Sequence, residues 1–136
     1  MDKALNYLSL ARKGGMAELG EEPVGGAARS GKAYVILVAS DAGDHTWRRA
    51  KSFAAGTDQQ AIKLPYNKDE MGLATGRTAL AIAAITDVSM ALALVSSLPQ
   101  PPAEAVEVLT AKAEKAKKRK AEAKAHQKNV RMGKKK

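Results

Sequence analysis

The residues with the clearest chemistry are basic side chains concentrated in the C-terminal part of the chain. Twelve of the 23 Lys and Arg residues lie between residues 99 and 136, where only four Glu residues oppose them, so this segment has a net charge of +8. The first 98 residues have a net charge of only +1. A dense, solvated cationic segment binds polyanions by releasing their condensed counterions. The segment therefore predicts affinity for nucleic acid.

The predicted phosphate contacts are nine of these basic residues: Lys112, Lys115, Lys117, Lys118, Arg119, Lys120, Lys124, Lys128 and Arg131. The segment contains no aromatic residue, so stacking on bases is not expected from it. Contacts to phosphate alone give affinity without sequence preference. The alternative is that the charge only keeps a disordered appendage solvated.

Other residue types give little sign of catalysis or of a cofactor. The chain has no cysteine, which excludes disulfides and thiolate metal sites. His45 and His126 are too far apart in the sequence to suggest a metal site, and Asp41 and Asp44 are typical of turns and caps. The segment 20–26 is rich in glycine but lacks the Gly-Lys-Ser/Thr ending of a phosphate loop. We therefore expect neither an enzyme nor a bound cofactor or metal.

Trp47 is followed directly by Arg48 and Arg49, a combination that could stack on bases and bind phosphate. The alternative, which the sequence favours, is that Trp47 belongs to the core and that the two arginines form a solvated helix face.

The elements that must position these residues alternate between helices and strands. Helices are predicted over residues 3–12, 23–30, 45–55, 67–75 and 88–98, and apolar strands over residues 34–39, 61–64 and 80–85. Residues 17–22 form a short polar connection. The strands are too apolar to face water on either side. The pattern predicts a three-layer α/β/α sandwich around a small, largely parallel or mixed sheet.

Capping signals support these boundaries. Asn67 with Glu70 three residues later predicts a capping box, and Gly76 predicts a left-handed C-cap for the same helix. Asp44 and Asp87 are each expected to cap the helix that follows.

A proline-rich break predicts where the folded domain ends. Pro99, Pro101 and Pro102 separate a domain of residues 1–98 from a basic tail of residues 99–136. Residues 103–127 are rich in Ala, Glu and Lys, which favours a helix but offers no sustained apolar stripe to dock it. We expect a helical or disordered tail that frays in water and orders when phosphates neutralise it.

The remaining composition points to a soluble, cytoplasmic protein without membrane contact. Asp2 and Asn6 interrupt the N-terminal residues, so no signal peptide is expected. No stretch approaches the roughly 18 apolar residues typical of a membrane span.

Several short segments carry a resemblance to a known family. They are Leu8–Gly15, Gly20–Val24 and Arg29–Ala33 in the first half of the chain, and Glu70–Gly72, Gly76–Arg77 and Ala83–Asp87 in the second. Their order and spacing resemble the kink-turn RNA-binding ribosomal protein family, which includes the archaeal large-subunit protein L-seven-Ae and the eukaryotic protein L-thirty-e. The resemblance covers residues 4–97, is to the short bacterial members, and excludes the basic tail.

The resemblance implies an α/β/α sandwich that grips a bent RNA internal loop with two segments. By position, the first segment is Gly20, Glu21 and Glu22, continuing to Gly26, and the second is Arg77, Thr78 and Ala79. A helix N-terminus suits phosphate, and a loop of small residues can approach unstacked bases.

The chain departs from the family pattern within the first segment. Where RNA-binding members usually have Asn, then Glu, and a Lys three residues further on, this chain has Glu22, Pro23 and Gly26. Four nearby basic residues could supply the lost phosphate contact, namely Arg12, Lys13, Arg29 and Lys32.

Two of these positions have alternative explanations. Glu21 and Glu22 could accept hydrogen bonds from guanine, or they could simply favour the first turn of a helix. Lys32 could contact phosphate, or it could favour the C-terminal end of the helix dipole.

Taken together, these patterns predict a non-enzymatic, ribosome-associated bacterial RNA-binding protein. Its partner would be ribosomal or other structured RNA, with DNA bound only non-specifically. The first alternative is a sequence-blind protein that coats DNA or RNA through the basic tail. The second is a protein-interaction module.

Overall fold

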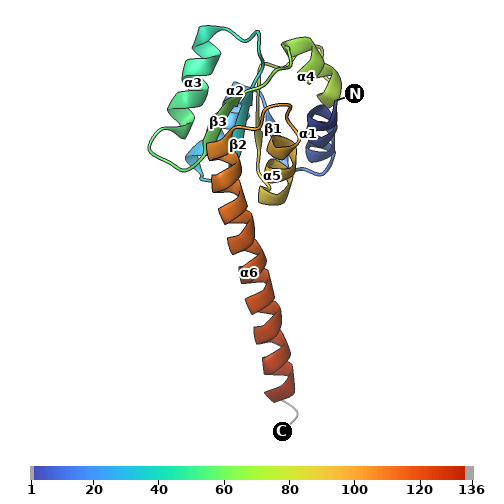
Figure 1. The fold of residues 1–136 in the computed structure, drawn as a ribbon, viewed down its shortest axis with the longest axis vertical. Helices are drawn as coiled ribbons and strands as arrows, with labels where there is room; N and C mark the ends of the chain where they lie inside the picture. Colours follow the sequence, from blue (N-terminus) through green and yellow to red (C-terminus); the bar gives the residue numbers. More distant parts are fainter. Residues whose placement is uncertain (1, 134–136) are drawn as a thin grey trace.

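The computed structural model of the chain describes residues 2–133, and side chains as far as Ala125. Within this range the helices are α1 (Lys3–Lys13), α2 (Glu21–Arg29), α3 (Asp44–Ala54), α4 (Lys68–Thr75), α5 (Val88–Ser96) and α6 (Ala103–Gly133). The strands are β1 (Ala17–Leu19), β2 (Val35–Val38), β3 (Gln60–Lys63) and β4 (Ile82–Ile85). Figure 1 shows a compact body from which α6 projects.

The four strands form one mixed sheet in the order β1-β4-β2-β3. β2 pairs with β3 in parallel, whereas β4 pairs with both β1 and β2 in antiparallel fashion. Of the two sheet types expected from the sequence, the mixed one is therefore present, and parallel pairing is confined to β2 and β3.

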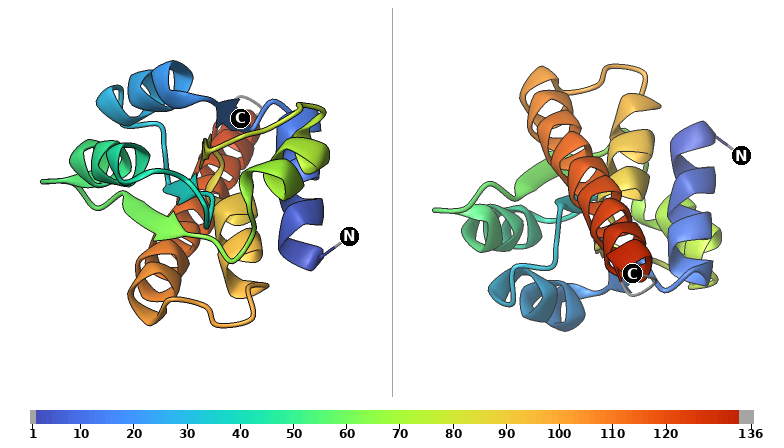
Figure 2. Two further views of the ribbon diagram at one scale, coloured as in Figure 1. Left: turned by 90° about the horizontal axis from the view of Figure 1, so that it is seen from above. Right: turned by 90° about the horizontal axis from the view of Figure 1, so that it is seen from below.

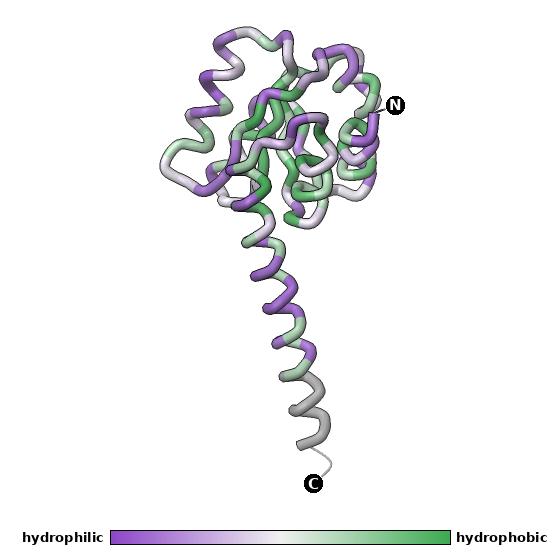
Figure 3. Tube along the Cα trace, viewed as in Figure 1, coloured by the Kyte–Doolittle hydropathy of each residue, from purple (hydrophilic) through white to green (hydrophobic). Residues whose placement is uncertain are grey.

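Helices cover both faces of the sheet, which confirms the predicted three-layer sandwich. Side chains of neighbouring residues in β2 and β4 point to opposite faces. One face packs against α2 and α3 through Ile36, Val38, Ile82 and Ala84. The other packs against α1, α4, α5 and the start of α6 through Val35, Leu37, Ala83 and Ile85. Figure 2 shows the two helical layers, and Figure 3 shows hydrophobic colour concentrated on the sheet between them.

The predicted caps are confirmed at two helices and wrong at a third. Asn67 and Glu70 form the capping box of α4, and Gly76 ends that helix with φ +72°. Asp87 accepts a hydrogen bond from the Met90 N–H at 2.9 Å and caps α5. Asp44, by contrast, is the first residue of α3 rather than its cap, because Gly43 occupies the N-cap position. An acidic side chain in a first turn still suits the helix dipole.

Residues 17–22 are more ordered than a polar connection. Ala17 to Leu19 form β1, which lies at the edge of the sheet against β4. α2 then begins at Glu21, two residues before the expected start at Pro23. Pro23 still lies in the first turn, where its missing N–H is not needed.

The beginning of α6 is part of the core. Ala105 and Leu109 are 2% and 0% exposed, and they pack in the same cluster as Leu94 of α5 and Leu98, which follows α5. The expectation that nothing docks the tail helix is therefore wrong for its first two turns. Ala105 and Leu109 are spaced i, i+4, so they lie on one face of the helix and dock its first turns on the core. The domain boundary at Leu98 stays a prediction, although core packing continues beyond it.

No helix in the described part of the chain has the length and apolar character needed to cross a membrane.

Candidate nucleic-acid interface

The first part of the candidate interface, called the loop surface below, consists of residues 20–22 and 77–79. Gly20 has φ +97°, a conformation that favours glycine, and its N–H donates to the Ile82 carbonyl at 3.0 Å. A methyl group placed on Gly20 would lie only 3.7 Å from Nη1 of Arg77. The two segments that the sequence assigned to RNA contact are thus neighbours in space.

Close packing on α4 positions the second segment. The Arg77 N–H donates to the Gly72 carbonyl at 2.8 Å, and a methyl group on Gly72 would lie 2.8 Å from backbone atoms of Arg77 and Ala79. A side chain at position 72 would therefore push this loop off the helix. Arg77, Thr78 and Ala79 are all exposed. The loop is held by its backbone and presents its side chains to solvent.

Arg12 adds a second guanidinium close to the loop surface. Its side chain reaches from α1 toward Gly76, where an added methyl group would lie 3.6 Å from Nη2 of Arg12. Gly76 directly precedes Arg77, and both arginines are exposed. Together they give this end of the body two cations suited to phosphate.

Glu21 is engaged by α3. Arg49 donates from Nε to Oε1 of Glu21 at 2.7 Å, and Nε2 of His45 lies 3.8 Å from the same oxygen. The Arg49 guanidinium also lies 5.1 Å from the centre of the Phe53 ring. Arg49 therefore ties α3 to the first turn of α2 and offsets one of its two negative charges, a role that sequence reasoning missed.

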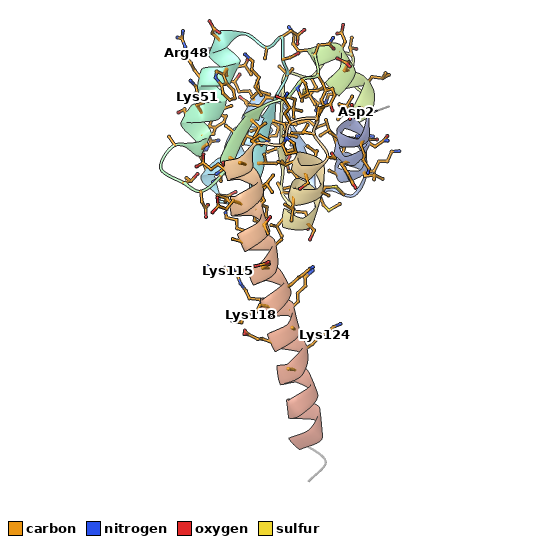
Figure 4. All side chains as sticks on the ribbon, viewed as in Figure 1. Asp2, Arg48, Lys51, Lys115, Lys118 and Lys124 are labelled. Atoms are coloured by element: carbon orange, nitrogen blue, oxygen red, sulfur yellow. The ribbon has the colours of Figure 1, made fainter. Side chains whose placement is uncertain are left out.

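The other candidates on α3, Trp47 and Arg48, are not arranged as a cluster that could stack on bases. Trp47 is half-buried and packs against the core, and the ammonium groups of Lys51 and Lys63 lie 5.5 and 5.9 Å from its ring centre. Arg48 is exposed. Figure 4 shows Arg48 and Lys51 extending outward from α3. This arrangement fits a partly buried tryptophan beneath a solvated basic helix face.

Gly26 marks an open position on α2. The residue is exposed, and a methyl group added there would meet no atom within 4 Å. Glu22 and Pro23 are also exposed in the first turn. The surface at Gly26 therefore has room for a long side chain.

Lys32 lies toward the opposite end of the sheet from Gly20. Lys32 is two residues before Tyr34, whose N–H donates to the carbonyl of Ile85, the last residue of β4. Gly20 bonds instead to Ile82, the first residue of that strand. Four residues of strand span roughly 10 Å between their ends.

The chain after Lys13 likewise runs to the far end of β4, because the Thr86 N–H donates to the Met16 carbonyl at 2.8 Å. The structure brings Gly20, Glu21 and Glu22 together with Arg77, Thr78 and Ala79, but it places Lys32 elsewhere, and Lys13 lies at the end of α1, next in the chain to Arg12.

α6 leaves the body at this far end. Nζ of Lys112 donates to Oδ1 of Asp58 at 2.8 Å and lies 5.4 Å from the centre of the Tyr34 ring. The hydrogen bond from Lys112 holds the pKa of the Asp58 carboxyl below its ordinary value. Lys112 is thus paired within the protein and is not counted among the phosphate-binding residues of α6.

The second part of the candidate interface is the arm, defined as residues 113–133 of α6. Its basic side chains within the described range are all exposed: Lys115, Lys117, Lys118, Arg119, Lys120 and Lys124. Figure 4 shows Lys115 and Lys118 on one side of the helix and Lys124 on the other. Lys128 and Arg131 lie on the same helix, but their side chains fall outside the described residues.

Two small cavities flank the base of the arm, and Tyr34 lines both. One has a volume of about 280 Å³ and is bordered by Lys115 and Arg119. The other has a volume of about 220 Å³ and is bordered by Lys117 and Lys120. The arm therefore presents cations on opposite sides from its first turns onward.

No protein-family model matches the chain, and no curated protein matches it in sequence. Among solved structures, a Bacillus halodurans protein described as having unknown function is similar with a TM-score of 0.68 and 23% identity, covering 74% of this chain and 100% of that one. The Giardia lamblia 15.5kD RNA binding protein is similar with a TM-score of 0.60 and 16% identity, covering 80% of this chain and 86% of that one. These likenesses show a shared fold.

Proposed function

We propose that the protein is a non-catalytic RNA-binding protein that recognises structured, kink-turn-like RNA through the loop surface and gains phosphate affinity from the arm. In this proposal it is bacterial, cytoplasmic and ribosome-associated. The loop surface selects the shape of the RNA, and the arm holds its backbone.

The observation that carries the proposal is the exposed charge of the arm. Six basic side chains between residues 113 and 125 face solvent, and only Glu114 and Glu122 oppose them. Every residue from Lys117 to Ala125 is exposed, so this part of the helix gains little from folding alone. Its charge density is suited to a phosphate backbone. The fold shared with an RNA-binding protein from Giardia lamblia supports RNA as the polyanion.

The loop surface supports recognition of shape. Gly20 and Ala79 are small, so RNA can approach the backbone closely between them. Arg77 and Arg12 border this small-residue surface and are suited to bidentate phosphate contacts. The pairing of Glu21 with Arg49 reduces the repulsion that an acidic first turn would exert on RNA.

The test is a direct comparison of two RNAs of equal length, a kink-turn hairpin and a straight hairpin. The full chain should bind the kink-turn hairpin about tenfold more tightly, the equivalent of roughly 1.4 kcal/mol. Arg77→Ala should reduce this preference. The matched control Lys51→Ala, which removes the same charge from the outer side of α3, should preserve it.

The second candidate is a sequence-blind coating protein, and cations on both sides of the arm favour it. Equal affinity for the two hairpins, unchanged by Arg77→Ala, would select this candidate. A full chain that binds neither hairpin in dilute buffer would contradict both candidates.

A further inference from the structure

The loop surface and the arm lie at opposite ends of the body. The loop surface adjoins Ile82, the first residue of β4, whereas the base of the arm adjoins Tyr34, which bonds to Ile85 at the other end of that strand. α6 begins beside Leu64 and Leu98, on the Ile82 side of the sheet. It then crosses the sheet and continues away from the body (Figure 1).

The separation is large compared with a local contact. β4 accounts for roughly 10 Å of it. The twelve helical steps from Lys112 to Lys124 add about 18 Å at 1.5 Å per residue. Lys124 is therefore on the order of 25 Å or more from the loop surface.

The exposed cations of the loop surface are also separated from those of the arm. Lys112 is the first basic residue of α6, and it forms an ion pair with Asp58. Before it, the helix is docked through Ala105 and Leu109. Available charge on α6 therefore begins at Lys115, at the edge of the body near Tyr34, and is separated from the arginines of the loop surface.

The arm itself is suited to phosphates on two sides. Because successive helical residues are about 100° apart, Lys115, Lys118 and Arg119 share one side, and Lys117, Lys120 and Lys124 share the other. A single RNA strand lying along the helix would contact only one of these sides. Two phosphate chains, such as those of a double-stranded segment, can contact both.

From this geometry we infer that the protein bridges two separate RNA segments, a bent segment on the loop surface and a double-stranded segment on the arm. The inference rests on the proposed RNA-binding function. Once one segment is bound, the second faces a high local concentration of binding sites, which brings two parts of a folded RNA together.

The test is the stoichiometry of complexes formed with two short hairpins of different mass, one with a kink-turn and one straight, measured by native mass spectrometry. The full chain should form a complex of one protein with both RNAs. In the arm variant, Lys115, Lys117, Lys118, Arg119, Lys120 and Lys124 are all changed to Gln. In the loop variant, Arg12 and Arg77 are changed to Ala. Each variant should form the complex with both RNAs at least tenfold less, while still binding one hairpin.

A control variant replaces the five arm lysines with Arg and should bridge as well as the natural chain, since it keeps the charge. Gln has a helix propensity close to that of Lys, so the arm variant should keep its helix content in circular dichroism. A full chain that binds one RNA but never two would overturn bridging and leave the proposed function standing. Complexes with two proteins and two RNAs would also overturn it. A full chain that binds neither hairpin would contradict the proposed function itself.

Discussion

The loop surface and the arm differ in how they are built and in how they present positive charge. The loop surface consists of short connections held by backbone hydrogen bonds and by glycines that allow close packing, with Arg77 and Arg12 at its border. The arm is a regular helix whose charge points to both sides. Defined geometry can discriminate between RNA shapes, whereas charge on a solvated helix attracts any phosphate backbone. In the proposed function, selectivity therefore belongs to the first region and affinity to the second.

The largest expected effect comes from neutralising the arm. Changing Lys115, Lys117, Lys118, Arg119, Lys120 and Lys124 to Gln should weaken binding to the straight hairpin on the order of a thousandfold at 50 mM salt, because about six phosphate contacts are lost. Fluorescence anisotropy measures the change. The variant with five Arg for Lys replacements should bind normally. If neutralisation left the affinity within twofold, the arm would play no part in binding.

The next effect concerns the docked start of α6, which contrasts with the solvated arm. Leu109→Ala should lower the free energy of unfolding by about 2–5 kcal/mol, because a fully buried leucine is removed from the core. Chemical denaturation measures it. Glu107→Ala, an exposed change one turn away or less, should stay within about 0.5 kcal/mol. Equal stability of both variants would mean that α6 is not docked.

A gain of function can sharpen the role of the loop surface. Gly26→Lys places a cation at an open, exposed helix position, so affinity for the kink-turn hairpin should rise about tenfold through one added charge-assisted contact. The protein should also become about 0.5–1 kcal/mol more stable, since Gly is a poor helix former.

The matched control for this gain is Ser52→Lys, which adds the same charge to the exposed face of α3. It should not raise the preference for the kink-turn over the straight hairpin. Equal gains from both variants would show that only net charge matters, and the loop surface would lose its assigned role.

The smallest effect is expected at the contact between Asp58 and Lys112, where arm and body meet. The pKa of Asp58 is lowered from 3.8 in the folded protein, so its contribution to stability is present above that value and is lost as the pH falls through the lower folded value. The Asp58 side chain is 68% exposed, so Asp58→Asn should cost less than about 1 kcal/mol at pH 7. Denaturation curves should show the two proteins converging below about pH 4. A difference that grew with acidity would contradict the pairing.

Local signals in the sequence predicted much of the fold. The Asn67 and Glu70 capping box, the left-handed Gly76 and the Asp87 cap all depend on residues within a few positions of one another, and all three are present. The prediction that Asp44 caps α3 was wrong because Gly43, which has no side chain to signal a cap, occupies the N-cap position. β1 was missed because Ala17–Leu19 is only three residues long, too short for a period to stand out.

The docking of α6 was also missed, although a signal for it exists. Ala105, Val106 and Leu109 form a short apolar face at helical spacing, but the Lys- and Ala-rich residues after it dilute the pattern over the full helix. The apolar face becomes visible only when the first turns of α6 are considered apart from the Lys- and Ala-rich residues that follow.

The candidate site was only partly predictable. The resemblance indicated both halves of the loop surface, and the structure brings them side by side at Gly20 and Arg77. The pairing of Glu21 with Arg49 joins residues 28 positions apart, which no local pattern reports. The placement of Lys32 at the far end of the sheet likewise depends on strand pairing rather than on its neighbours in sequence.

The most direct test of this division of labour is the salt dependence of binding to the straight hairpin, measured for the natural chain and for the variant with six neutral arm residues. Plotted as the logarithm of affinity against the logarithm of salt concentration, the slope for the natural chain should be steeper by about 4 to 5. Equal slopes for the two proteins would contradict the central claim that the arm is the phosphate-binding part of the molecule.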